Sequence, residues 1–250
     1  MPLHGDRIRR MKASLFEFRH RWWVIFFIFM AAFLAYSIDP KNSAVAIADW
    51  SARLVHSDAA RAPGEWYQFT FALGAVLVGV AAFLRTWGTS YLQAEVMRDS
   101  EVHTEKLLAD GPYRHVRNPL YLGNILLSVG MGLIASRIGF LVLSIGMTVF
   151  VVRLILREES ELLRDRGESY RNYCAAVPRL VPSLTARIPS AGNPAHWKQG
   201  IAAELMYWLI ALAMAAFAWT LNLGVFWGVF TVAFFSSWLL KKPRKKDHPK

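Results

Sequence analysis

The hydrophobic residues of the chain gather into six long runs that polar segments separate. Each run holds about 16–21 mostly apolar residues, near the length of helix that crosses about 30 Å of hydrocarbon. The pattern therefore predicts an all-α, polytopic membrane protein with about six transmembrane helices. The predicted spans cover residues 22–38, 67–84, 120–135, 138–156, 201–221 and 223–240. The first run follows basic residues, as in a signal peptide, but it is long, aromatic and without a small-residue cleavage pattern, so we interpret it as an anchor.

Short polar breaks predict how neighbouring spans connect. Only Ser136 and Arg137 separate the third span from the fourth, and Asn222 separates the fifth from the sixth, so each pair is predicted to form a tight antiparallel hairpin. The fourth span is predicted to continue as one long helix to Gly167, a glycine of the kind that ends helices. A second short helix is expected at 169–176, before a linker at 188–196 that is rich in Pro, Gly, Ser and Asn.

The longer polar segments carry weaker signals. Residues before Arg21 form a basic segment that suits an interfacial helix, and residues 43–55 show a weak helical pattern on the outer surface. Residues 85–118 are predicted to be a polar cytoplasmic loop, in which 89–96 is either strand-like or extended. The chain thus divides into an N-terminal part with the first span and outer loop (1–66), a membrane core (67–185), and a linker, C-terminal hairpin and basic tail (186–250).

Composition and charge agree with this interpretation. The chain is 54% hydrophobic and 14% aromatic, with ten Trp and sixteen Phe, and its mean hydropathy is +0.27. Most of its 29 Lys and Arg residues lie on the side of the two chain ends, which places both termini in the cytoplasm. This asymmetry explains most of the net charge of +11, so nucleic-acid binding is not predicted. We expect an integral protein of the bacterial inner membrane, with the tail at 241–246 touching anionic lipid.

Two polar motifs stand at the cytoplasmic ends of the third and fourth predicted spans. The first motif, residues 111–123, reads Gly-Pro-Tyr-Arg-His-Val-Arg-Asn-Pro-Leu-Tyr-Leu-Gly. The second motif, residues 153–182, begins with Arg153, Arg157, Glu158 and Glu159 as the fourth span leaves the membrane. Because the hairpin makes these spans antiparallel neighbours, the two motifs must meet at the cytoplasmic end. Charges at helix ends also serve as structural ion pairs, so position alone does not assign a function.

The residue types favour an amino-acid-like ligand. A carboxylate suits an ammonium group, and Arg, Tyr or amide donors suit a carboxylate, which together match the zwitterionic end of S-adenosylmethionine. Neither a G-x-G-x-x-G after a strand nor a G-x-x-x-x-G-K-[ST] occurs, which excludes a soluble Rossmann-type methyltransferase but not its cofactor. Cys174 is the only cysteine and is interpreted as a buried thiol, and the scattered histidines show no metal-ligand spacing, so no metal site is predicted.

The first motif resembles the GPY-x-x-VRHP-x-Y-x-G signature of integral-membrane methyltransferases, the isoprenylcysteine carboxyl methyltransferase and phospholipid N-methyltransferase group. The second is similar to that family's EE-x-x-L-x-x-x-x-G-x-x-Y-x-x-Y-x-x-x-VPR-x-x-P run. The resemblance covers roughly residues 67–183. The resemblance implies a cytoplasmic S-adenosylmethionine pocket lined by Tyr113, Arg117, Asn118, Pro119, Tyr121, Gly123, Glu159, Tyr170, Tyr173 and Pro178. The catalytic candidates are Arg153, Glu158 and Glu159.

Roles within this set stay partly open. Either Glu159 or Glu158 would hold the cofactor's ammonium, and Arg153 would orient an anionic acceptor. The family usually has His where this chain has Asn118, and an amide donates hydrogen bonds but carries no positive charge. Asn118 would therefore hold the cofactor carboxylate less tightly, unless Arg117 compensates.

The resemblance implies an S-adenosylmethionine-dependent methyltransferase that acts, by direct in-line transfer, on a lipidic or isoprenoid-linked carboxylate, thiol or amine. A sterol-reductase-type membrane reductase, which uses NADPH and has a similar Arg-His-Pro-x-Tyr element, is the alternative, and a non-catalytic membrane protein with the same fold is a third. The Glu158-Glu159 pair and the Val177-Pro178-Arg179 run favour the methyltransferase. The expected partners are membrane lipid and a lipidic or small-molecule acceptor. The acceptor's identity, the oligomeric state and the role of the C-terminal hairpin stay open.

Overall fold

The computed structural model describes residues 11–55, 64–99 and 110–240, and every regular element in these ranges is a helix. The predicted all-α class is confirmed. The elements are α2 (Leu15–Arg19), α3 (Arg21–Leu34), η1 (Ala35–Ser37), α4 (Ser43–Val55), α5 (Gly64–Asp99), η2 (Gly111–Arg114), α6 (Pro119–Gly132), α7 (Arg137–Ala176), α8 (Trp197–Ala203), α9 (Leu205–Thr220) and α10 (Leu223–Leu240).

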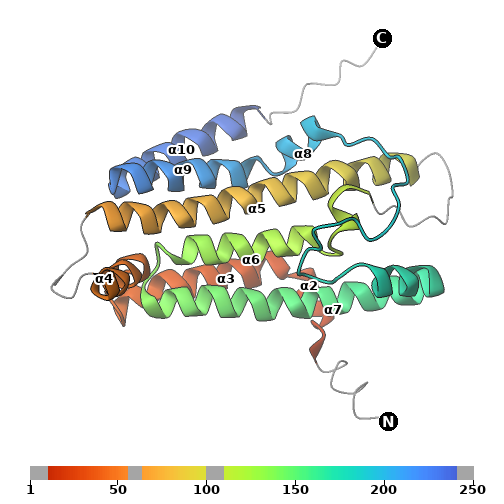
Figure 1. Cartoon of the computed structure of the whole chain (residues 1–250), viewed down its shortest axis with the longest axis horizontal. Coiled ribbons are helices and arrows are strands. Elements are labelled where there is room, and N and C mark those ends of the chain that lie inside the picture. Colours follow the sequence, from red (N-terminus) through yellow and green to blue (C-terminus); the bar gives the residue numbers. More distant parts are fainter. Residues whose placement is uncertain (1–10, 56–63, 100–109, 241–250) are drawn as a thin grey trace.

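The long helices pack in a chain of neighbours across the bundle. Helix α10 packs on α9, α9 on α5, α5 on α6, α6 on α7, and α7 on α3 (Figure 1). Glycines allow the closest approaches: a Cβ at Gly130 of α6 would meet the Gly74 carbonyl oxygen of α5 at 2.7 Å. The core between the helices is apolar and is centred on Val78, Leu143, Met147, Val151 and Met214.

The structure corrects the predicted loop after the second span. Helix α5 runs for 36 residues, so residues 85–99, including the 89–96 segment, are helical instead of strand-like or extended. The reason is tertiary packing, because polar positions such as Thr86 and Ser90 are buried against α8 instead of facing solvent. The part of the predicted loop at 100–109 lies outside the described residues.

Several other local predictions are confirmed. Helix α4 occupies 43–55, and short connections join α6 to α7 and α9 to α10. Gly167 has non-helical dihedral angles (φ 53°, ψ −126°) and bends α7 where the helix was expected to end. Residues 188–196 carry no helix. The basic N-terminal segment contains α2, whose N-cap Ser14 forms a capping box with Glu17.

Two described helices are long and apolar enough to cross a membrane, Gly64–Leu92 of α5 and Arg137–Ala176. A third candidate is the pair Trp197–Ala203 and Leu205–Thr220, which is bent by 65° at Glu204. The shorter apolar helices are Arg21–Ser37, Pro119–Gly132 and Leu223–Ser236. Six spans and the orientation of the termini therefore stay predictions.

Candidate functional site

The first motif forms a tight turn and the start of α6. Asn118 is the N-cap of α6, and Pro119 occupies its first position, where a missing N–H costs no helical hydrogen bond. Gly111 begins η2 with a φ of 56°, and a Cβ there would collide with the ring of Tyr91 on α5. A glycine is therefore required where the chain turns into the motif.

Side chains of the first motif bond directly to both glutamates of the second. The Tyr121 hydroxyl donates to Oε1 of Glu158 at 2.6 Å, and Nδ2 of Asn118 donates to Oε1 of Glu159 at 3.1 Å. Successive helical positions point about 100° apart, so the two carboxylates have different surroundings. The predicted meeting of the motifs is confirmed, while the assigned roles stay predictions.

Glu159 is buried and faces two arginines, of which Arg117 is also buried whereas the side chain of Arg179 is 44% exposed. Its Oε2 accepts hydrogen bonds from Nε of Arg179 at 3.0 Å and forms an ion pair with Nη2 at 2.8 Å. On its other side, Nε of Arg117 lies 3.5 Å from Oε1. The glutamate is 5% exposed, and the cluster holds two guanidinium groups for one carboxylate. This end of the site thus has an excess of positive charge.

Arg117 has unused hydrogen-bonding capacity. Its side chain is 9% exposed, and its Nε, although within ion-pair distance of Glu159, is not aligned for a hydrogen bond with any described residue. A buried guanidinium nitrogen without an acceptor is unfavourable in a finished core. The position therefore suits an anionic group supplied by a ligand.

Aromatic residues close one side of this cluster. The rings of Tyr170 and Tyr173 lie 5.8 Å apart, both are buried, and the Tyr173 hydroxyl donates to the Tyr113 carbonyl oxygen at 2.9 Å. The Arg117 amide donates to the Pro178 carbonyl oxygen at 2.9 Å. The structure thus brings the four predicted residues Tyr113, Tyr170, Tyr173 and Pro178 together around Arg117.

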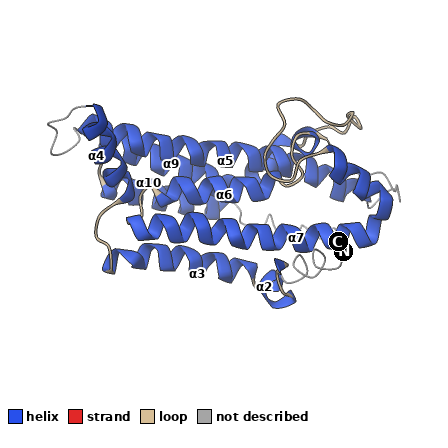
Figure 2. Ribbon diagram, turned by 60° about the horizontal axis from the view of Figure 1, so that its bottom comes forward, coloured by secondary structure: helices blue, strands red, loops and turns tan. Residues whose placement is uncertain are grey.

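A long segment between α7 and α8, residues 177–196, runs along the first motif, and we name it the strap. Backbone amides of the strap donate to motif carbonyl oxygens in antiparallel order, Ser183 to His115 at 3.0 Å and Arg187 to Arg114 at 2.9 Å. The strap lies at the end of the bundle opposite α4 (Figures 1 and 2). It also contributes Arg179, which sequence reasoning did not include among the site residues, although the Val177-Pro178-Arg179 run was the signal that pointed to it.

Asp110 forms hydrogen bonds with the C-terminal part of the strap. It was not among the predicted site residues. Its carboxylate is 3% exposed and accepts hydrogen bonds from the side chains of Ser190 and Asn193 and from the backbone amides of Ala191 and Asn193. Burial alone would raise the pKa of Asp110, but these hydrogen bonds outweigh it and hold the pKa below its usual range. The aspartate before the Gly-Pro-Tyr turn therefore sets where the strap lies.

Two predicted site residues lie apart from this cluster. Arg153 forms an ion pair with Glu17 of α2 at 2.7 Å, so it connects the N-terminal helix to α7. Gly123 faces α5, where a Cβ would collide with the side chain of Arg85. Neither residue contacts Glu159 in the hydrogen bonds and ion pairs described above, and their predicted roles stay predictions.

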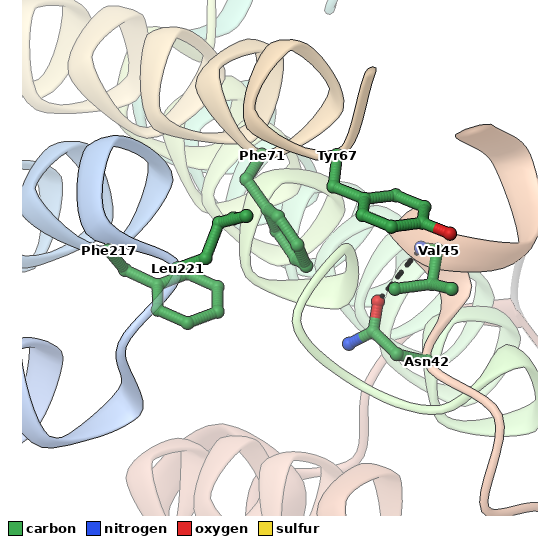
Figure 3. Close-up of a pocket in the computed structure, with 6 residues that line it drawn as sticks. All are labelled: Asn42, Val45, Tyr67, Phe71, Phe217 and Leu221. Atoms are coloured by element: carbon green, nitrogen blue, oxygen red, sulfur yellow. Dashed lines mark hydrogen bonds between the residues drawn. The ribbon is translucent and has the colours of Figure 1, made fainter. Parts of the chain in front are cut away.

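A cavity of about 290 Å³ lies at the other end of the bundle, beside α4 (Figure 3). Its lining is mainly apolar and comes from α4, α5, α9 and the loops beside them. The lining residues are Asn42, Val45, Tyr67, Phe71, Phe217 and Leu221. Asn42 caps α4 by accepting a hydrogen bond from the Val45 amide at 3.1 Å (Figure 3). Since neither motif contributes to this cavity, we do not assign it to the candidate site. Among the described residues, no group of three His, Cys, Asp or Glu side chains could hold a metal ion.

Comparison with known proteins identifies what the two motifs resemble. The family model of phospholipid methyltransferases matches residues 69–166, from α5 to the glutamates of α7 and on toward Gly167. A methanethiol S-methyltransferase of Crocosphaera subtropica is 31% identical over 117 residues, which are 46% of this chain and 45% of that protein. Methanethiol S-methyltransferase 2 of Bradyrhizobium diazoefficiens is 31% identical over 90 residues, 36% of this chain and 34% of that protein.

The chain thus spans less than half the length of these curated relatives. No solved structure matches the chain. The family match ends before the strap and the C-terminal helices, so Arg179 and helices α8 to α10 are outside it.

Proposed function

Because the chain belongs to the phospholipid methyltransferase-like family of membrane proteins, we propose that it is a methyltransferase that uses S-adenosylmethionine and acts on a thiol. The observation that carries the proposal is the direct contact of Tyr121 with Glu158 and of Asn118 with Glu159. These contacts join the two motifs inside the matched region, and they create two carboxylate environments side by side.

The residues present fit the amino-acid end of this cofactor. The unaligned, buried Nε of Arg117 offers a donor to the cofactor carboxylate, and the excess positive charge of the Glu159 cluster favours an anion there. Glu159, with lone pairs on both oxygens, would accept the cofactor ammonium while it orients the two arginines. Tyr113, Tyr170 and Tyr173 would cover the remaining cofactor surface. S-adenosylmethionine, when bound, supplies a methyl group that its sulfonium has already activated.

Glu158 serves the acceptor side in this proposal. It faces Tyr121 and not the arginine cluster, and among the described residues only its Oε1 has a hydrogen bond. A thiol becomes nucleophilic when it loses its proton, and the Glu158 carboxylate would take that proton from the acceptor. The Tyr121 hydroxyl fixes the orientation of the carboxylate. The product of such a transfer would be a methyl thioether.

The thiol is proposed because both curated relatives are named for methanethiol S-methylation. The site also lies at the end of the bundle that carries Arg114, Arg179 and Arg187, which by the positive-inside rule is the cytoplasmic end. We therefore propose that the donor enters from the cytoplasm and that a small, membrane-soluble thiol reaches Glu158 from the lipid between helices.

Donor binding tests the proposal directly. Purified protein in nanodiscs should bind radiolabelled S-adenosylmethionine in equilibrium dialysis, and unlabelled NADPH should not compete. In the same preparation, methyl label should pass to methanethiol and to other short alkyl thiols. Absence of donor binding, or competition by NADPH, would overturn the proposal.

The acceptor is tested by a second series. Alkyl thiols of increasing chain length, a lipid extract, and an isoprenylated cysteine should be compared by mass spectrometry of the labelled product. We expect a labelled thioether with the shortest thiols and no labelled phospholipid. A labelled lipid or methyl ester would retain the methyltransferase and reject the thiol.

A further inference from the structure

A second buried cluster joins the C-terminal helices to the candidate site. Glu204 lies at the bend between α8 and α9 and is 6% exposed. It accepts hydrogen bonds from Nε and Nη2 of Arg85 at 2.7 and 3.1 Å, and from the Thr89 hydroxyl at 2.8 Å. Glu204 lies beyond the family match, whereas Arg85 and Thr89 of α5 lie inside it.

Arg85 also contacts the first turn of α6. Its Nη1 donates to the Leu120 carbonyl oxygen at 3.2 Å and to Oδ1 of Asn124 at 2.8 Å. Asn124 in turn accepts from the hydroxyl of Tyr207 on α9 at 2.6 Å, and the Arg85 guanidinium lies 4.2 Å from the centre of the Tyr207 ring. The absence of a side chain at Gly123 is what lets Arg85 pass this close to α6.

These contacts bracket Tyr121 in the sequence of α6. Arg85 holds the backbone of the residue before it and the side chain three positions after it, while Tyr121 bonds to Glu158 on α7. The turn that carries the Tyr121 hydroxyl is thus fixed from α5 and from the bend at Glu204. A displacement of a catalytic group by about 1 Å is enough to cost on the order of 100-fold in rate.

Anchoring alone does not account for this cluster. A buried ion pair is a poor way to join two helices, since apolar side chains of similar size do so at least as well. Charged residues in membrane helices are expensive to bury and are generally functional. The Arg85 guanidinium donates hydrogen bonds to Glu204, Leu120 and Asn124. These directional bonds fix the orientation of the joined helices, which apolar packing would not do.

We propose that Arg85 and Glu204 are positioning residues, which hold Tyr121 in register with Glu158 through the first turn of α6. This inference rests on the proposed methyltransferase function. If it holds, the bent helix pair α8–α9 helps to position the catalytic residues, although this pair lies beyond the residues that the family model matches.

A double-mutant cycle with Tyr121 tests the inference, because residues that act through one another have non-additive effects. Glu204→Gln should lower kcat at least tenfold while the dissociation constant of S-adenosylmethionine changes less than twofold. In a Tyr121→Phe background, the same substitution should lower kcat less than twofold further. A purely structural pair would give the same factor in both backgrounds, and that result would overturn the inference.

Two further variants make the test robust. Asp39→Asn alters an ion pair with Arg137 at the opposite end of the bundle and is the matched control, whose effect should be equal in both backgrounds. If Glu204→Gln does not yield folded protein, Thr89→Val removes a single hydrogen bond to Glu204 and should give a roughly threefold loss of kcat that disappears with Tyr121→Phe. An additive Thr89→Val effect would also overturn the inference. Failure of the wild type to bind donor would instead reject the proposed function.

Discussion

The Glu159 cluster and the Arg85–Glu204 cluster both consist of glutamate and arginine side chains, but they differ in the number of arginines for each glutamate. Glu204 and Arg85 face each other one to one, and both arginine terminal nitrogens and both glutamate oxygens have hydrogen-bond partners. Glu159 instead faces two arginines, and Nε of Arg117 has no aligned acceptor among the described residues.

We infer from this difference that the Arg85–Glu204 cluster has a positioning role and the Glu159 cluster a binding role. A cluster whose charges and hydrogen bonds are complete has nothing to offer a ligand, but it fixes the helices that it joins. A cluster with excess charge and an unused donor is incomplete until an anion arrives. Burial does not distinguish the two, since Glu159 is 5% exposed and Glu204 is 6% exposed.

The largest expected effect is on stability. Arg85→Ala leaves Glu204 buried without its guanidinium and should cost about 3–5 kcal/mol of unfolding free energy. Arg117→Ala should cost only about 1 kcal/mol, because Glu159 keeps Arg179 as a partner. Thermal unfolding of both variants in the same detergent measures the contrast. Equal losses would mean that the two clusters have the same structural role.

Donor binding should depend on the Glu159 cluster, whose loss costs less stability, more than on the Arg85–Glu204 cluster. Glu159→Gln and Arg117→Ala should each weaken S-adenosylmethionine binding by more than tenfold, about 1.4 kcal/mol or more, because each removes a charged partner of the amino-acid end. Glu161→Gln, two residues further along α7 and paired with Arg157, is the matched control and should change binding less than twofold. Normal binding by both site variants would show that the pocket is misplaced.

Two substitutions of Tyr121 should separate an effect on kcat from an effect on donor affinity. Tyr121→Phe keeps the ring but removes the hydrogen bond to Glu158, so kcat for methyl transfer should fall about tenfold, in the range of an acid–base positioning effect, while donor affinity stays within twofold. Tyr121→Ala also removes the ring, which the family resemblance assigns to the cofactor site, and should weaken donor binding more than tenfold. Kinetics and dialysis on the two variants measure both effects. A Phe variant with normal kcat would remove Glu158 from its proposed role.

The sequence predicted the meeting of the motifs because one short hairpin connects two apolar helices. It also placed the breaks at Gly167, whose φ of 53° suits a glycine, and at Asn222, whose side chain accepts a hydrogen bond from the Gly224 amide at the start of α10. It did not predict that α5 would continue to Asp99, because the burial of Thr86 and Ser90 depends on contact with α8, more than 100 residues away. Polar residues in a helix and polar residues in a loop look alike until their partner is known.

The same limit applies to the site. Tyr121, Asn118 and Glu159 come from motifs and were predictable, whereas Arg179 and Asp110 act through a strap without periodic pattern. Glu204 is a single charge before an apolar run, so only its contact with Arg85 shows its importance. Pairings across long sequence separations are what the structure adds.

The pH dependence of stability should show whether the charge of Asp110 holds the strap in place. The pKa of Asp110 is lowered in the folded protein, so its contribution to stability is complete above the unfolded pKa of about 3.9 and is lost as the pH falls through the lower folded value. Asp110→Asn should therefore lower Tm by a few degrees at neutral pH, with the difference shrinking below pH 4. A pH-independent difference in the unfolding curves would show that the charge of Asp110 does not hold the strap.

The smallest effect is expected at Asn118, where the family usually has histidine. The Asn118 amide donates to Glu159 and to the Arg179 carbonyl oxygen at 3.2 Å, so it holds the acidic and basic groups of the cluster together without adding charge. A histidine donates through one ring nitrogen as well, and its positive form would add attraction for the donor carboxylate. Asn118→His should therefore keep donor affinity within twofold or raise it, whereas Asn118→Asp should lower it by placing a second carboxylate against Glu159. A collapse of binding in the His variant would mean that the amide carries a function of its own, and the unused donor of Arg117 would then no longer suffice to define the anion site.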